Sequence, residues 1–138
     1  MRLSTKGQYA VRAMVVLAMH GGAGPVSLRF IAEREDISEQ YLEQIFIGLK
    51  KAQLVKGVRG ASGGYTLAKP SQLMTSGDIV RAVEGPIKIV DCEHNGTCER
   101  VQSCVTRELW ERVSAAMSQV LDATTLADLV LRAGEKIN

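Results

Sequence analysis

The sequence predicts a mainly α-helical fold with one small β-hairpin, and three observations support this prediction. Apolar residues recur at helical spacing through most of the 138 residues. After residue 52 this pattern gives way to two short runs rich in β-branched residues on either side of a glycine-rich turn. Near the C-terminus, apolar residues recur at alternating steps of four and three, which is typical of a coiled-coil seam.

The N-terminal part is expected to form three helices, each opened by a serine that can cap the first backbone N–H groups. Ser4 precedes the first helix, which ends in the glycine-rich segment 20–25. Ser27 precedes a short second helix and Ser38 the third. Asp36 lies at the turn between them, where glycine would be usual and where aspartate tolerates left-handed backbone better than most residues. The apolar face of the third helix consists of Leu42, Ile45, Phe46 and Leu49.

A hairpin is predicted next, with strands over 54–58 and 65–67. Two helices joined by a tight turn and followed by a basic hairpin indicate a winged helix-turn-helix. A fourth helix is expected to open at Thr75 or Ser76 and to end near Gly85.

A long helix is predicted over 105–121, and Thr125 is a candidate N-cap for a last short helix over 126–131. The coiled-coil seam on the long helix consists of Leu109, Val113, Ala116 and Val120.

Composition and charge narrow the class of protein. No run of 18 apolar residues occurs, so no membrane span is expected. The first residues lack the apolar core of a signal peptide and the three cysteines are an odd number, so we expect a cytoplasmic chain with reduced thiols. Residues 1–70 hold ten Lys or Arg against five Asp or Glu, whereas residues 71–138 hold seven against ten. A basic N-terminal half suits a polyanion-binding face, although ordinary fluctuation could produce the same distribution.

Enzyme chemistry is not expected. No nucleophile–base pair or catalytic carboxylate constellation is recognisable, and the segment 57–64 lacks the G-K-S/T end of a phosphate-binding loop. An iron–sulfur or zinc enzyme whose winged domain binds only protein stays an alternative.

The helix that begins after Ser38 is expected to lie in the major groove of DNA, with its N-terminal turn towards base edges. Glutamine can pair with adenine edges, and glutamate can accept a hydrogen bond from the cytosine amino group. An ordinary solvated helix would show the same polar face. The candidate reading residues are Ser38, Glu39, Gln40, Tyr41, Glu43 and Gln44.

The hairpin supplies a candidate wing. Arg59 lies beside glycines, which let the backbone approach a phosphate or a minor groove closely. The candidate wing residues are Arg59, Gly60, Ser62 and Gly63. Other cations are available for phosphate contacts, which position a protein without reading sequence, or are plain surface charges: Arg2, Lys6, Lys50, Lys51 and Lys56.

Three cysteines, Cys92, Cys98 and Cys104, stand six positions apart in one short segment. Thiolates are soft ligands that favour zinc, copper(I) and iron–sulfur clusters. Structural zinc, here with His94 as fourth ligand, usually has closer C-x₂₋₄-C spacing. Redox-active or inert thiols without any metal are the other alternative.

These residues carry a resemblance to a known family. The segments 1–10, 38–44, 58–60, 63–67 and 109–110 resemble the Rrf2 (BadM-type) winged-helix transcription regulators, and within them the iron–sulfur cluster regulators. The resemblance covers essentially the whole chain. The combined motifs are specific, whereas each alone is weak.

The resemblance implies a homodimeric transcription factor that binds a palindromic operator in double-stranded DNA, with half-sites about 34 Å apart. It implies that the three cysteines hold an iron–sulfur cluster and that the long helix crosses its twin through Leu109, Val113, Ala116 and Val120. The expected parts are a winged helix-turn-helix domain at 1–84, a cluster-binding cysteine loop at 85–104, and a dimerisation helix with a C-terminal helix at 105–138.

The chain departs from the cluster-binding members at the fourth ligand. These members place a histidine three residues after the last cysteine, where this chain has Arg107, or a carboxylate at position 8, where it has Gln8. Arginine stays protonated and cannot bind iron. Glu93, Glu99 and Glu108 lack the family's spacing. We therefore favour a [4Fe–4S] cluster with one open iron over a [2Fe–2S] cluster with a substitute ligand; sensing through thiol redox or a protein partner, without a cluster, stays open.

Overall fold

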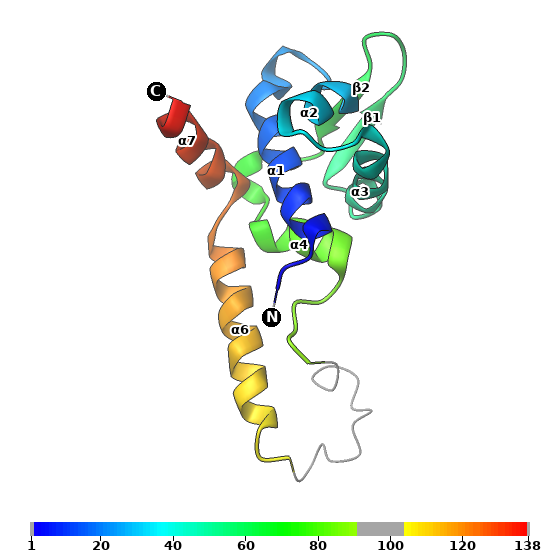
Figure 1. Ribbon diagram of the computed structural model, residues 1–138. Helices are drawn as coiled ribbons and strands as arrows, with labels where there is room; N and C mark the ends of the chain where they lie inside the picture. The colour runs from blue at the N-terminus through cyan, green and yellow to red at the C-terminus, as the bar shows by residue number, and fades with distance from the viewer. Residues whose placement is uncertain (1, 91–103, 138) are drawn as a thin grey trace.

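The computed structural model describes residues 2–90 and 104–137. Its first body contains α1 (Thr5–His20), α2 (Leu28–Glu35), α3 (Glu39–Lys51), the hairpin strands β1 (Val55–Val58) and β2 (Gly64–Leu67), and α4 (Ser76–Glu84), with short 3-10 turns η1 (Gly21–Ala23) and η2 (Ser71–Leu73). The helix α6 (Arg107–Ala123) extends away from this body, and α7 (Leu126–Ile137) lies beside α1 (Figure 1). The predicted mainly α-helical winged-helix fold is confirmed.

The three predicted serine caps are present. The hydroxyls of Ser4, Ser27 and Ser38 each accept a hydrogen bond, 3.1 Å long, from the backbone N–H three residues later. Asp36 has φ 54° and ψ 48°, the left-handed conformation expected at this turn. Local capping therefore fixes where α1, α2 and α3 begin.

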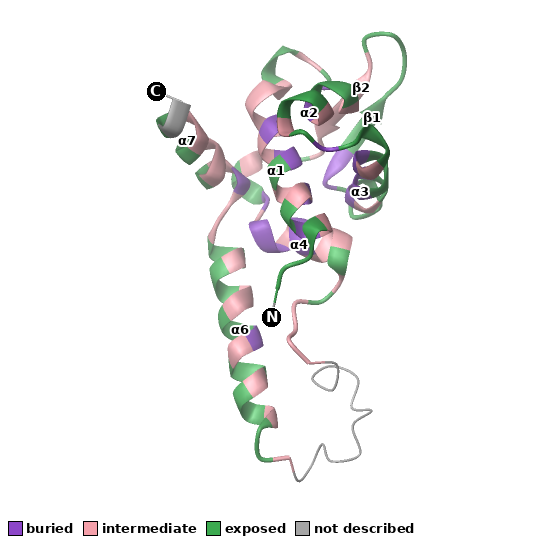
Figure 2. Ribbon diagram, viewed as in Figure 1, coloured by how far each residue is buried: buried purple, intermediate pink, exposed green. Residues whose placement is uncertain are grey.

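The core lies where α1, α3 and α4 meet, and Figure 2 shows buried residues on all three helices. Gly48 allows α3 to approach α4 closely, because a Cβ atom at this position would lie 2.9 Å from the Ala82 carbonyl oxygen. The largest fully buried side chains are Phe46, Met14, Leu17, Ile31, Leu42, Ile45, Leu49, Met74, Ile79 and Leu126.

The hairpin pairs Val55 with Leu67 and Val58 with Gly64. Each strand is thus one residue displaced from its predicted start. Tyr65 exchanges two backbone hydrogen bonds with Val26, 2.9 and 2.8 Å long, and its ring lies 4.7 Å from the ring of Phe46. These contacts fix the hairpin to the start of α2 and to α3.

The C-terminal helices differ in length from the prediction. The long helix runs over 107–123 rather than 105–121, and the prediction that the last helix ends at 131 is wrong, since α7 continues to Ile137. Gly134 does not end α7, because packing against α1 outweighs the weak helix propensity of glycine. Backbone hydrogen bonds from Ser76 to Thr124 and from Leu126 to Met74, both 2.8 Å, join the α6–α7 connection to the start of α4.

Among the helices at 2–90 and 104–137, none is sufficiently long and apolar to span a lipid bilayer.

Candidate nucleic-acid interface and cysteine segment

The predicted reading residues lie together on the outer face of α3. Ser38, Glu39, Gln40, Glu43 and Gln44 are exposed, and Tyr41 is half-buried. A shallow depression between α3 and the start of α1 is lined by Lys6 together with Ser38, Gln40, Tyr41, Glu43 and Gln44. The fold therefore brings one of the predicted phosphate-binding cations next to the predicted base-reading side chains.

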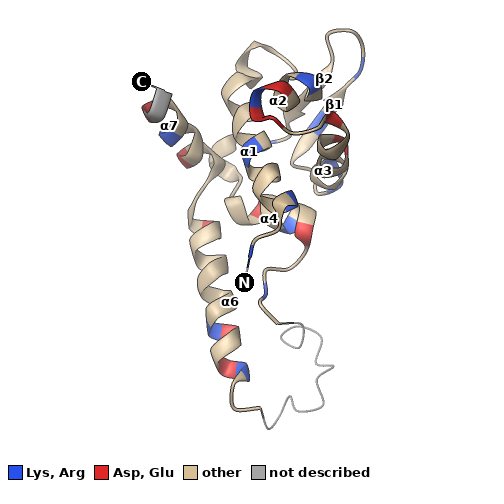
Figure 3. Ribbon diagram, in the orientation of Figure 1, with Lys and Arg blue, Asp and Glu red and all other residues tan. Residues whose placement is uncertain are grey.

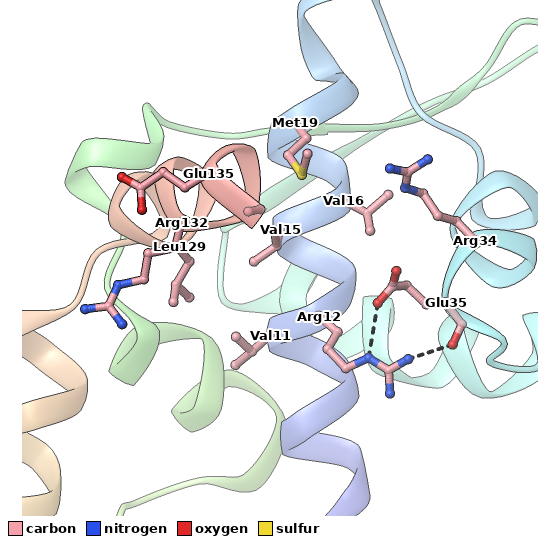
Figure 4. A pocket seen from close by; sticks show the side chains of 11 residues that line it. Val11, Arg12, Val15, Val16, Met19, Arg34, Glu35, Leu129, Arg132 and Glu135 are labelled. Atoms are coloured by element: carbon pink, nitrogen blue, oxygen red, sulfur yellow. Dashed lines mark hydrogen bonds and ion pairs between the residues drawn. The ribbon is translucent and has the colours of Figure 1, made fainter. Parts of the chain in front are cut away.

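A chain of aromatic and charged contacts holds this end of α3 against α1 and α2. The rings of Tyr9 and Tyr41 meet edge to face with centroids 5.7 Å apart, and the Arg12 guanidinium lies 5.0 Å from the Tyr9 ring. Arg12 also donates to the Glu35 carboxylate at 3.1 Å and to the Glu35 carbonyl at 2.7 Å (Figure 4). Contacts among α1, α2 and α3 thus hold the orientation of the predicted reading face.

Sequence analysis missed this set of positioning residues, which comprises Tyr9, Arg12 and Glu35. Tyr9 and Arg12 are three residues apart on one helix face, and that spacing is the only local signal. Their contacts with Glu35 and Tyr41 join distant parts of the chain, so the spacing alone could not reveal them.

The side of α1 that carries Arg12 forms the floor of an open groove of about 950 Å³ between α2 and α7 (Figure 4). Its lining consists of aliphatic, methionine, arginine and glutamate side chains, including Val11, Val15, Met19 and Leu129. None of the described residues that line the groove is a Ser, Cys or His, the side chains from which a nucleophile–base pair of a hydrolytic site is usually built.

The wing is an exposed loop whose shape requires glycine. Gly60 has φ 111°, and a Cβ atom on Gly63 would collide with the Val58 carbonyl oxygen. Arg59 and Ser62 are exposed on this loop. The loop projects beyond the strands β1 and β2, away from the helices (Figure 3). The Lys50 amine lies near Gly57 of β1, since a Cβ atom there would be 3.8 Å from Nζ.

The other predicted phosphate contacts are also accessible. Arg2, Lys50 and Lys51 are exposed, and Lys6 is half-buried. The segment that carries Arg2 is attached to α4, because the Ser4 backbone N–H donates to the Glu84 carboxylate at 3.1 Å.

The cysteine segment is described only at its two ends. Cys92 and Cys98 lie outside the described residues, as do Glu93, His94 and Glu99. Cys104 is half-buried three residues before α6, and its Sγ lies 3.2 Å from the Thr106 hydroxyl. Within 2–90 and 104–137, no three His, Cys, Asp or Glu side chains gather into a possible metal site.

Both ends of the cysteine segment are attached to α6. The Ile89 backbone N–H donates a 3.1 Å hydrogen bond to the hydroxyl of Ser114, which is buried with 5% exposure in the middle of α6. At the other end, Cys104 accepts a backbone hydrogen bond from Arg107, the first residue of α6. A change in the conformation of 91–103 would therefore act on α6 at two places.

Arg107, which stands where the resemblance implies a ligand histidine, takes part in an ion pair. The Arg107 Nε atom lies 2.9 Å from the Glu111 carboxylate, one turn further along α6. On the same helix, the predicted dimerisation residues Leu109 and Val120 are 49% and 67% exposed; Ala116 is exposed and Val113 is half-buried.

Comparisons with known proteins agree with this architecture. The family profile of Rrf2, described as an iron-dependent transcriptional regulator, matches residues 3–132. The regulator CymR of Bacillus subtilis is 45% identical over 129 residues, which cover 94% of this chain and 89% of CymR.

Two solved structures are also similar. CymR, the global cysteine regulator of B. subtilis, superposes with a TM-score of 0.80 at 44% identity, covering 96% of this chain and 98% of that one. IscR of T. potens superposes with a TM-score of 0.81 at 46% identity, covering 99% of this chain and 90% of that one. The chain therefore belongs to the Rrf2 family of transcriptional regulators, which are winged-helix DNA-binding proteins and not enzymes.

Proposed function

We propose that this regulator binds a palindromic operator as a homodimer and that an iron–sulfur cluster on Cys92, Cys98 and Cys104 sets its operator affinity. The observation that carries the proposal is the attachment of both ends of the cysteine segment to α6, through Ile89–Ser114 and through Cys104. When bound, the cluster supplies a group that is lost or altered by iron shortage, oxygen or nitric oxide. Three thiolates match the soft donors that such clusters require.

The route from the cysteine segment to DNA runs through three helices. The apolar residues Leu109, Val113, Ala116 and Val120 of α6 pack against the same helix of a second copy. The end of α6 is bonded to the start of α4 through Thr124 and Ser76, and α4 lies against α3 at Gly48. A shift of α6 therefore changes the separation and tilt of the two α3 helices in the dimer. The dimer with the cluster and the dimer without it then differ in operator affinity.

On the DNA side, each protomer reads one half-site from the major groove. Gln40, Glu43 and Gln44 reach base edges, with Ser38, Glu39 and Tyr41 around them. Arg59 enters the neighbouring minor groove from a wing whose turn is made by Gly60, Ser62 and Gly63. Arg2, Lys6, Lys50 and Lys51 contact phosphates.

A second candidate is a regulator of the same family that senses thiol oxidation or a protein partner and holds no cluster. The ion pair of Arg107 with Glu111, at the position of the family's ligand histidine, favours it. The similarity to CymR, a global cysteine regulator, favours it as well.

Protein purified without oxygen separates these candidates. The cluster proposal expects a brown protein that contains iron and sulfide, either about four or about two of each per protomer. Mössbauer spectra should then identify the cluster type. Cys→Ser variants at 92, 98 and 104 should lose the iron and change operator affinity. Val105→Ala, beside Cys104 and 94% exposed, is the matched control and should behave as the parent chain.

Arg107→His sharpens the comparison, because it restores a nitrogen ligand at the family spacing. If a cluster is present, its absorbance should persist longer in air in this variant. An iron-free protein whose operator affinity responds to peroxide and to each Cys→Ser change would instead establish thiol sensing. If the protein is iron-free and its operator affinity responds neither to peroxide nor to the Cys→Ser changes, the cysteines do not take part in sensing.

A further inference from the structure

Ile47 is an exposed aliphatic side chain in the middle of a polar helix face. It is 62% exposed on α3, and the buried residues of that helix, Leu42, Ile45, Phe46 and Leu49, lie on the opposite side. Gln40, Glu43 and Gln44 precede it by seven, four and three positions, so all four residues share one face. Lys51 follows four positions later on the same face.

The location of Ile47 on α3 distinguishes it from an ordinary exposed apolar residue. A single exposed apolar residue is ordinary on a protein surface, and Ile47 does not belong to the core formed by the described residues. Here, however, the exposed residue continues the row of the proposed base-reading side chains. It also precedes the turn that carries Lys50 and Lys51, the proposed phosphate contacts, and so lies between bases and backbone.

We propose that Ile47 is a specificity-determining residue that recognises the 5-methyl group of a thymine in the major groove. The inference rests on the proposed placement of α3 in that groove. Thymine differs there from cytosine in carrying a methyl group, which an aliphatic side chain recognises by apolar contact. Glutamine and glutamate on the same face read hydrogen-bonding edges, so Ile47 adds a kind of discrimination that they do not provide.

Geometry and stiffness suit this role. Ile47 lies four positions after Glu43, which corresponds to about 6 Å along the helix axis. That distance spans roughly two base pairs at about 3.4 Å each, so Ile47 contacts a different base pair from Glu43. An isoleucine in a helix has one strongly preferred χ1 rotamer, so little side-chain freedom is lost on contact.

The test removes one methyl group at a time from the DNA. The operator is first selected from a randomised duplex library with the parent chain. Each thymine of the half-site is then replaced by deoxyuridine, at constant salt concentration. At one thymine the parent chain should bind the uracil operator about fourfold more weakly for each half-site changed, the value expected for one buried methyl group. Ile47→Ala should bind the two operators equally, whereas Ile47→Val should retain part of the preference.

Two controls make the result decisive. Gln44→Ala should bind more weakly overall yet keep the uracil penalty, and thermal unfolding should show that Ile47→Ala is folded. If Ile47→Ala keeps the full penalty at every thymine, the inference is wrong. If Gln40→Ala and Glu43→Ala also leave the selected sequence and the affinity unchanged, the placement of α3 in the groove fails as well.

Discussion

Arg81 and Asp122 form a two-pronged ion pair between α4 and the end of α6. The two terminal nitrogens of the guanidinium lie 2.8 and 2.7 Å from the two carboxylate oxygens, and the Thr75 hydroxyl donates to the same carboxylate at 3.4 Å. Gly77 makes room for this pair, because a Cβ atom there would collide with the Asp122 carboxylate. The hydrogen bonds from Arg81, its charge and the Thr75 hydroxyl lower the pKa of Asp122.

The ion pair should make folding stability depend on acidity. Because the pKa of Asp122 is lower in the folded state than its unfolded value of about 3.9, the pair stabilises the fold above about pH 4. This contribution is lost as the pH falls through the folded-state pKa. Asp122→Asn should therefore lower the free energy of unfolding at pH 7 and flatten its decline below pH 4.

The loss at pH 7 should stay below about 1 kcal/mol, since the side chains are 36% and 43% exposed and water screens the pair. Urea unfolding at fixed protein concentration from pH 7 to pH 3 measures both effects. Glu33→Gln, which removes the more exposed Arg29–Glu33 pair, should change the free energy of unfolding little at pH 7. Identical pH profiles for Asp122→Asn and the parent chain would contradict the prediction.

Gly48→Ala should destabilise the winged domain. The added Cβ atom would lie 2.9 Å from the backbone oxygen of Ala82, so α3 and α4 must separate. Overpacking of this kind costs about 1–3 kcal/mol, measured by urea unfolding. Gly134→Ala on α7 is the matched control, because a Cβ atom there would meet no described residue from outside its own turn of helix within 4 Å, and alanine favours helix by up to about 1 kcal/mol. Equal effects of the two changes would refute the close approach at Gly48.

The features that sequence analysis predicted correctly are those determined by neighbouring residues. The caps at Ser4, Ser27 and Ser38 need only a hydroxyl three residues before a backbone N–H, and the turn at Asp36 needs only a residue tolerant of positive φ. The apolar face of α3 follows from helical periodicity.

The features that sequence analysis missed depend on residues far apart in the sequence. The length of α7 follows from packing against α1, and the Arg12–Tyr9–Tyr41 contacts join helices that a single sequence does not place side by side. The cysteines show donor chemistry by their type alone, yet the Ile89–Ser114 bond, which ties their segment to α6, spans 25 positions. The predicted DNA-contacting residues lie on the described fold, whereas Cys92 and Cys98 lie outside the described residues, so the roles of both sets remain predictions.

Ser114→Ala should weaken communication between the cysteine segment and DNA. The change removes the acceptor for the Ile89 N–H and should cost about 1 kcal/mol of stability. On the proposed function, the ratio of operator affinities with intact and chelator-stripped protein should move towards one. Fluorescence anisotropy with labelled operator measures this ratio. Ser118→Ala, one turn further along α6, should keep the parent ratio, and an unchanged ratio in Ser114→Ala would exclude this bond as the link.

Arg59→Ala should weaken operator binding by removing one cation from each wing. A contact of Arg59 with the minor groove or its phosphates releases bound counterions, so the variant dimer should show a slope of log affinity against log salt that is smaller by about two. Arg132→Ala on α7 removes the same charge away from the wing and should keep the parent slope, which separates a specific contact from a change in net charge. Because Arg59 is exposed on a loop shaped by Gly60 and Gly63, its removal should leave the fold intact. A parent-like affinity and salt slope for Arg59→Ala would therefore place the wing outside the interface and leave α3 as the part that binds DNA.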